Sequence, residues 1–168
     1  MSVMKYGIGM RTQYAAGTEM QTAFAEQMEQ ARLAEKLGFD SLMKSSHLAG
    51  HPLQEFQQLP FLCRVMAEAP SLRLITGVML LSLHKPLDIA EQLATMDVMS
   101  SGRLIFGVGL GYREVEFKAF GTTSKERVKR FEENLIAIKR LWTEDRVSMT
   151  GSHFELGDAA LSLKPSQK

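Results

Sequence analysis

The feature that most restricts the fold of this chain is a regular alternation of short apolar runs with longer amphipathic segments. The apolar runs predict strands at 4–10, 39–44, 72–81 and 103–108, and the segments between them have helical periodicity. The run at 72–81 is apolar almost throughout, which is typical of a parallel strand covered on both faces. A strand with its following helix occupies roughly 30 residues, the usual size of a βα unit. The pattern therefore predicts an α/β protein with a parallel sheet.

Cap and turn residues predict where the helices begin and end. Polar pairs with capping-box spacing precede two helices, prolines open two others, and a glycine ends the first. In chain order these positions are Thr18 with Gln21, Gly38, Pro60, Pro86, and Thr123 with Glu126. The expected buried face of the last helix is Val128, Phe131, Leu135, Ile138 and Leu141.

The segment after Trp142 loses helical periodicity. We expect a small β-hairpin there, with strands at 147–149 and 153–156 around Thr150 and Gly151. Residues 161–163 are then expected to form a fifth strand.

Two architectures fit four or five βα units. They form either a complete open doubly wound sheet or the first half of a (β/α)8 barrel of the TIM type, which needs about 250 residues. The chain ends after a strand with no covering helix, which favours the half barrel. We therefore expect residues 1–168 to be a single domain that stops before the second half of the barrel. A half barrel leaves an apolar edge open, so we also expect a homo- or hetero-oligomer that covers it.

Composition excludes several classes of partner and location. The net charge is +1, which argues against nucleic acid as a partner. Cys63 is the only cysteine, and the first residues lack the basic and apolar regions of a signal peptide. No apolar run approaches the roughly 20 residues that span a bilayer. These observations predict a cytoplasmic protein that acts on a small molecule away from the membrane.

A glycine run at 107–111 directly follows the fourth expected strand. Glycine is needed where the backbone turns sharply or approaches a ligand closely. The dinucleotide fingerprint requires a third glycine three places after the second, but Tyr112 or Glu114 stands there, depending on the starting glycine. The run is therefore a tight turn or one wall of a pocket, and its spacing does not match a Rossmann site.

His47 is the leading candidate for acid–base chemistry because it follows the second expected strand. The C-terminal ends of parallel strands carry the active site in such folds. A histidine there can donate a proton or a hydrogen bond. His51 has metal-ligand spacing from it, but the intervening Leu-Ala-Gly does not form a steady helix, so we predict no metal site. His84 could face the same end or a solvated loop, and His153 is expected at the surface.

Basic residues gather near the start of the last helix. Arg127 and Arg130 could hold a phosphate there. Interleaved Glu126, Glu132 and Glu133 favour an ordinary salt-bridged helix surface instead. No nucleophile elbow accompanies the serines and histidines, so a covalent hydrolase is not supported.

Several motifs together resemble the luciferase-like monooxygenase family, including its deazaflavin-dependent oxidoreductases. They extend over nearly the whole chain, from the second expected strand to the hairpin. The motifs are Gly38-Phe39-Asp40-Ser41-Leu42, Ser46-His47, Ala90 to Asp97, Gly102-Arg103-Leu104, Gly107 to Tyr112, Glu116-Phe117, Gly121, Glu126-Arg127, Leu141-Trp142 and Leu163-Lys164-Pro165.

The resemblance implies a barrel that binds FMN or the deazaflavin coenzyme factor 420 at its C-terminal mouth. It implies an enzyme that transfers hydride or inserts oxygen into a small organic substrate, with the cofactor carrying the chemistry. It also implies a cis peptide between Gly77 and Val78. The expected catalytic residues are His47 and Tyr112. The expected cofactor-binding residues are Ser46, Gly77, Val78, Leu80, Gly107, Gly109, Leu110 and Gly111.

Three positions depart from the pattern of the family. Ser46 stands where an acidic residue is common, and Lys85 replaces a frequent histidine. Tyr112 stands where relatives often have Trp and some deazaflavin dehydrogenases have a catalytic Glu, so the sugar-phosphate dehydrogenase mechanism is not implied. Two other functions stay open: a non-catalytic truncated or split-barrel subunit, and a flavodoxin-like binding module.

Overall fold

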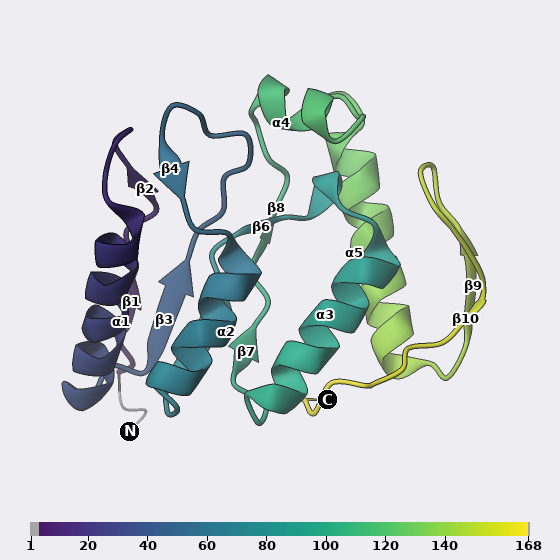
Figure 1. The fold of residues 1–168 in the computed structure, drawn as a ribbon. Helices are drawn as coiled ribbons and strands as arrows, with labels where there is room; N and C mark the ends of the chain where they lie inside the picture. The colour runs from purple at the N-terminus through teal and green to yellow at the C-terminus, as the bar shows by residue number, and fades with distance from the viewer. Residues whose placement is uncertain (1–3, 168) are drawn as a thin grey trace. The chain divides into compact units, whose positions relative to one another are not determined.

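The structure is a computed structural model that describes residues 4–167 (Figure 1). The chain divides into two compact units. The first unit comprises the residues up to 79 together with 103–107, and the second comprises 80–102 together with the residues from 108 onward. None of the described helices is long and apolar enough to cross a membrane.

The first unit is built on a parallel sheet of four strands. They are β1 (Gly7–Gly9), β3 (Ser41–Lys44), β5 (Arg73–Thr76) and β7 (Leu104–Ile105), in the spatial order β1-β3-β5-β7. The spatial order of the four strands is therefore the same as their order along the chain. A doubly wound sheet reverses this order at a switch point, and this sheet does not. The strand order thus favours the barrel over the open sheet and over a flavodoxin-like module.

Register and burial explain why the apolar runs form this sheet. Leu42 pairs with Leu74, which pairs with Leu104 on the next strand. All three side chains are buried. Helix α2 (Gln58–Glu68) packs on β3 and β5 through residues that include Leu62 and Val65, both fully buried. It begins two residues before Pro60, close to the expected start.

Helix α1 (Met20–Lys36) is capped differently from the prediction. The carboxylate of Glu19 accepts hydrogen bonds from the Gln21 and Thr22 backbone N–H groups at 3.0 and 2.5 Å. Thr18 instead donates its hydroxyl to Ala15 O, so the capping box predicted there is wrong. Glu19 replaces it because its longer side chain satisfies two N–H groups of the first turn.

The end of α1 and the following loops agree with the sequence in part. Gly38 ends the helix with φ +81°, as expected. Two short strands, β2 (Gln13–Tyr14) and β4 (Gln54–Glu55), form an antiparallel pair within segments expected to be loops. Their pairing depends on residues distant in the chain, so local periodicity does not show it.

The long apolar run at 72–81 is not one strand. Strand β5 ends at Thr76, and the peptide bond between Gly77 and Val78 is cis, as the family resemblance implied. A short strand β6 (Met79–Leu80) and a 3-10 turn η1 (Leu81–Leu83) follow. The fourth run is likewise divided, into β7 and β8 (Val108–Gly109).

The second unit is mainly helical. Helix α3 (Pro86–Met99), with Pro86 in its first turn as predicted, packs against α5 (Arg127–Thr143). Ile89, Leu93 and Ile138 are among the buried apolar residues of this unit. A short helix α4 (Glu114–Ala119) precedes α5 and was not expected.

The capping box predicted for α5 is wrong, and its predicted buried face is confirmed only at Ile138 and Leu141. Glu126 is its N-cap but makes no side-chain capping bond; its carboxylate accepts from the Thr122 hydroxyl at 2.6 Å instead of completing a box with Thr123. The buried stripe is Arg130, Asn134, Ala137, Ile138 and Leu141. Val128 and Leu135 are 48% and 41% exposed. Arg130 and Asn134 take the buried positions in the first half of the helix because they donate hydrogen bonds to buried carbonyl groups.

The hairpin after α5 is confirmed. Strands β9 (Val147–Thr150) and β10 (Glu155–Ala159) pair antiparallel. The fifth strand expected at 161–163 does not form. Ser162 donates its backbone N–H to Glu91 Oε1 at 3.0 Å, and Lys164 donates to Leu141 O at 2.6 Å. The Glu91 side chain on α3 and a backbone carbonyl of α5 thus hold this segment in an irregular conformation.

Candidate functional site

The residues expected in the first unit gather at one edge of its sheet. His47 follows β3, and Gly77 with Val78 follows the neighbouring strand β5. The Gly77 N–H donates to Lys44 O at 2.9 Å, which joins the ends of the two strands. Ser46 and Gly107 lie in the loops that follow β3 and β7. This is the C-terminal edge of the parallel strands, where such folds place their sites.

A buried charge pair anchors the loop that carries His47. Glu55 Oε1 accepts from the His47 backbone N–H at 3.1 Å and lies 3.5 Å from Lys44 Nζ. Both charged side chains are almost completely buried. Burial lowers the pKa of Lys44, and the Glu55 carboxylate partly opposes this shift. Gln58 donates to Lys44 O at 2.7 Å, so the end of β3 is also tied to α2.

The sequence did not single out Lys44 or Glu55. A lysine at the end of an apolar strand is an unusual choice for a buried position, because an unpaired buried charge is costly. The lysine at the end of this apolar strand was therefore the one sign in the sequence of a buried charge pair. Its partner lies eleven residues later in a stretch that local patterns assign to a loop, so the pair could not be recognised.

The Thr76 hydroxyl fixes the position of Gly107. It accepts from the Gly107 N–H and donates to Gly107 O, both at 2.9 Å. Met79 N–H donates to the same carbonyl at 2.9 Å. A Cβ atom at Gly107 would overlap the Thr76 carbonyl oxygen. The glycine is therefore required for close backbone approach, as its position in the run suggested.

Two apolar side chains are exposed at this edge. Val78 is 40% exposed, and Met43 on β3 is also exposed. A Cβ atom at Gly77 would overlap the Met43 side chain, so Gly77 lets Met43 pack directly against the backbone. The edge therefore combines an apolar platform at Val78 and Met43 with a half-buried histidine.

The remaining predicted residues belong to the second unit. Leu80 is buried, and the Leu110 carbonyl accepts from the Ser82 hydroxyl at 2.6 Å. Gly111 has φ +75° and lies against the Phe117 ring, so a side chain there would be strained. Tyr112 is 72% exposed. Gly109 lies within β8.

One of the other three histidines, His153, does not lie where the sequence analysis expected it. His51 is exposed. His84 lies just after η1, and burial lowers its pKa. The His153 side chain is only 7% exposed, so the expected surface position is wrong. Residues 4–167 contain no group of three or more side chains arranged to hold a metal ion.

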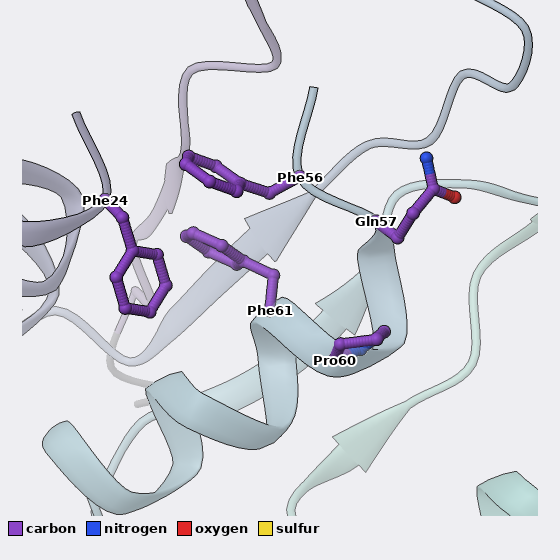
Figure 2. A pocket seen from close by; sticks show the side chains of 5 residues that line it. All are labelled: Phe24, Phe56, Gln57, Pro60 and Phe61. Carbon is purple, nitrogen blue, oxygen red and sulfur yellow. The ribbon is translucent and has the colours of Figure 1, made fainter. Parts of the chain in front are cut away.

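A separate cavity lies between α1 and the start of α2 (Figure 2). Its volume is about 240 Å³. Its lining is Phe24, Phe56, Gln57, Pro60 and Phe61. The rings of Phe56 and Phe61 are stacked with centroids 6.0 Å apart. None of these side chains is titratable and none was predicted as a site residue, so the cavity offers no acid–base group.

Comparison with known proteins now assigns the family. A model of the luciferase-like monooxygenase family matches residues 4–168. The chain belongs to this family. One luciferase-like relative, the F420-dependent glucose-6-phosphate dehydrogenase of Microbacterium testaceum (strain StLB037), is 33% identical over 172 residues, covering 96% of this chain and 49% of that protein. Another, the FMNH(2)-dependent dimethylsulfone monooxygenase of Pseudomonas putida, is 30% identical and covers 82% of this chain and 39% of that protein.

Solved structures confirm the half-barrel fold expected for a luciferase-like chain. Monooxygenase RslO1 from Streptomyces bottropensis superimposes with a TM-score of 0.88 at 30% identity, covering 98% of this chain and 51% of that one. The oxygenating constituent of 3,6-diketocamphane monooxygenase from Pseudomonas putida, in complex with FMN, superimposes with a TM-score of 0.86 at 16% identity, a likeness of fold alone. The luciferase-like chain spans about half the length of the relatives that it matches.

The sheet edge of this luciferase-like chain suits a flat apolar ring. Val78 presents an exposed methyl surface beside the cis peptide, and Gly107 keeps the adjoining backbone free of side chains. His47 lies in the loop after the neighbouring strand and supplies a group that can donate a hydrogen bond or a proton. The exposed apolar side chain, the bare backbone and the neighbouring histidine therefore fit a flavin or deazaflavin ring.

Proposed function

We propose that this protein is a flavin- or deazaflavin-dependent oxidoreductase or monooxygenase that acts on a small organic substrate. The cofactor would be FMN or F420, and the reaction hydride transfer or oxygen insertion. The observation that carries the proposal is the exposed Val78 side chain, which lies just after β5 at the sheet edge that also carries His47 after β3. Relatives that use each cofactor support the choice of cofactor class.

The roles that we propose follow from the chemistry of each residue. Val78 would support one face of the ring, and the backbone at Gly77 and Gly107 would approach it closely. His47 would donate a hydrogen bond or a proton, and Ser46 would bind the cofactor beside it. In the second unit we propose Tyr112 as the other catalytic residue. The cofactor-binding residues that we propose in the same unit are Leu80, Gly109, Leu110 and Gly111.

The bound cofactor would supply the two-electron chemistry, whereas the protein orients and shields it. The protein's contribution would be to exclude water with Val78 and to hold the His47 ring through the anchored loop. We further propose a cytoplasmic protein without nucleic-acid or membrane partners. A homo- or hetero-oligomer would cover β1 and β7, each of which pairs on one side only among the described residues.

Cofactor titration tests the proposal. The purified protein is titrated with FMN, with reduced FMN and with F420, while cofactor fluorescence and thermal stability are followed. Saturable binding of at least one cofactor is expected, with a rise in the unfolding temperature as the ligand concentration exceeds Kd. Val78→Asp should abolish binding, because the bound ring would remove water from a carboxylate that has no partner there. Absence of saturable binding by all three would refute the proposal and favour a non-catalytic subunit.

A further inference from the structure

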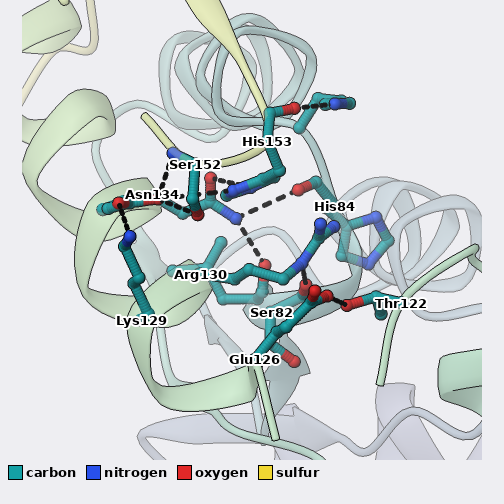
Figure 3. Close-up of polar contacts among 12 residues, drawn as sticks. Ser82, His84, Thr122, Glu126, Lys129, Arg130, Asn134, Ser152 and His153 are labelled. Carbon is teal, nitrogen blue, oxygen red and sulfur yellow. Dashed lines mark hydrogen bonds and ion pairs between the residues drawn. The ribbon is translucent and has the colours of Figure 1, made fainter. Parts of the chain in front are cut away.

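A polar stripe on α5 faces the turn that follows β6 (Figure 3). Arg130 is only 7% exposed and Asn134 is fully buried. Buried polar side chains need hydrogen-bond partners, because an unpaired buried group is destabilising. Their partners are backbone carbonyl groups at 81–84, so the stripe supplies hydrogen-bond donors to the turn that contains η1.

Asn134 bridges two carbonyl groups of this turn. Its Nδ2 donates to Leu81 O at 2.8 Å and to His84 O at 3.0 Å. These two bonds fix the orientation of the amide, since only the nitrogen donates. Asn134 Oδ1 must then accept, and its partner is His153 Nε2 at 3.0 Å. The proton of a neutral His153 is therefore on Nε2.

Arg130 acts on the middle of the same turn. Its Nε donates to Ser82 O at 2.7 Å. The Ser82 hydroxyl, which is fully buried, donates to Leu110 O at 2.6 Å. A chain of hydrogen bonds thus runs from α5 through η1 to the glycine segment at 107–111. Leu110 is one of the residues that we propose to bind the cofactor.

The tip of the β9–β10 hairpin completes the network. Lys85 donates its ammonium group to His153 O. Glu133 on α5 accepts from Ser152 N–H at 2.8 Å and from its hydroxyl at 2.6 Å. The hairpin tip is therefore bound both to α5 and to the residue after His84. His153 reaches Asn134 from this docked position.

We infer that Asn134, Arg130 and Ser82 are positioning residues for the proposed cofactor site. They set the conformation of the η1 turn and the orientation of the Leu110 carbonyl without themselves touching the cofactor. The inference rests on the proposed function. It explains why α5 buries an arginine and an asparagine and leaves Val128 and Leu135 exposed.

Two variants and one matched control test the inference. Asn134→Asp replaces the donor with an acceptor that faces two carbonyl oxygens, and Ser82→Ala removes the bond to Leu110. Trp142→Phe removes a bond of comparable strength, from Trp142 Nε1 to Ala90 O at 3.1 Å, which joins α5 to α3 away from the turn. All three should lower the unfolding temperature. If Asn134 and Ser82 had only a structural role, their variants would match Trp142→Phe in cofactor affinity.

The deciding readouts are local hydrogen exchange and cofactor affinity. Amides at 81–85 and 110–113 should exchange faster in Asn134→Asp and Ser82→Ala, measured without cofactor, and at wild-type rates in Trp142→Phe. The affinity for FMN, reduced FMN or F420, whichever the wild type binds, should fall about tenfold in the first two variants only.

The outcomes separate this inference from the proposed function. If the wild type binds none of the three cofactors, the proposed function fails, and the inference that depends on it fails with it. If the wild type binds a cofactor but Asn134→Asp and Ser82→Ala match Trp142→Phe in affinity, only the positioning inference is overturned. Unchanged exchange at 81–85 in Asn134→Asp would also overturn it, whatever the affinities.

Discussion

The two units hold their candidate site residues by different means. In the first unit, a buried ion pair between Lys44 and Glu55 anchors the His47 loop. In the second unit, Asn134 and the Ser82 hydroxyl bind backbone carbonyl groups as neutral donors, and Arg130 is the charged member. The first arrangement depends on both charges being present. The second depends on donor geometry, so the two should respond differently to substitution and to pH.

Breaking the ion pair should have the largest effect. Glu55→Leu leaves the Lys44 ammonium buried without its counter-charge and removes the acceptor for the His47 N–H. We expect the free energy of unfolding to fall by about 3 to 5 kcal/mol, measured by denaturant titration. The double variant with Lys44→Met is the control. It should recover much of this loss, because two apolar side chains replace the pair without an isolated charge.

A loss of stability below about 1 kcal/mol in Glu55→Leu would contradict the view that the first unit depends on both charges of the pair. It would mean that Lys44 loses its proton or reaches water when its partner is removed. Burial already lowers the Lys44 pKa, so the neutral amine is the form to look for.

Closing the space at Gly107 should have the next largest effect. Gly107→Ala places a methyl group against the Thr76 carbonyl oxygen, so the backbone must shift. We expect a loss of about 1 to 3 kcal/mol together with weaker cofactor binding. Gly157→Ala is the matched control, because no atom lies within 4 Å of its Cβ position. Equal stability of the two variants would show that Gly107 is not sterically required.

The histidines of the second unit should make its stability dependent on pH. The pKa of His153 is lowered by burial and then by Arg130 and Lys85, and burial lowers the pKa of His84. The unfolded chain therefore binds protons at a higher pH than the folded chain. The stabilising contribution is complete above the unfolded pKa of about 6.5 and is lost as pH falls toward the folded value.

His153→Gln isolates one of these contributions. Glutamine retains an N–H donor for Asn134 but does not titrate. The stability of this variant should fall less than that of the wild type between about pH 7 and about pH 5, as measured by thermal unfolding. An unchanged pH slope would place the effect elsewhere, in His84 or in carboxylates.

The smallest expected effect tests which face of α5 is buried. Leu135→Ala should cost less than about 1 kcal/mol, because this side chain is 41% exposed. Ile138→Ala, on the buried stripe of the same helix, should cost about 2 to 5 kcal/mol. Comparable losses would show that Leu135 belongs to the buried face together with Ile138, as hydrophobic periodicity predicted.

Local sequence patterns predicted the positions of helices and strands better than they predicted the side-chain contacts between them. Apolar runs located the four strands of the sheet, and Gly38 and Pro86 marked helix ends correctly, because these signals act on the backbone nearby. Both capping boxes were wrong, since a carboxylate at Glu19 or Glu126 offers alternative partners that spacing does not reveal. The strand expected at 161–163 was wrong because Ser162 and Lys164 bind α3 and α5 instead.

The same division applies to the candidate site. The sequence by itself placed His47 and the glycine run at the ends of strands, because apolar runs and glycine positions can be read directly from it. The cis bond between Gly77 and Val78 was implied only by the family resemblance, since the apolar run at 72–81 predicted an unbroken strand there. Only the tertiary structure showed that Lys44 pairs with Glu55, and that α5 turns Arg130 and Asn134 inward. Burial of a polar group is decided by its partner, and these partners come from other segments of the chain. Hydrophobic periodicity assumes that apolar side chains face the core, whereas the carbonyl groups of η1 required donors there.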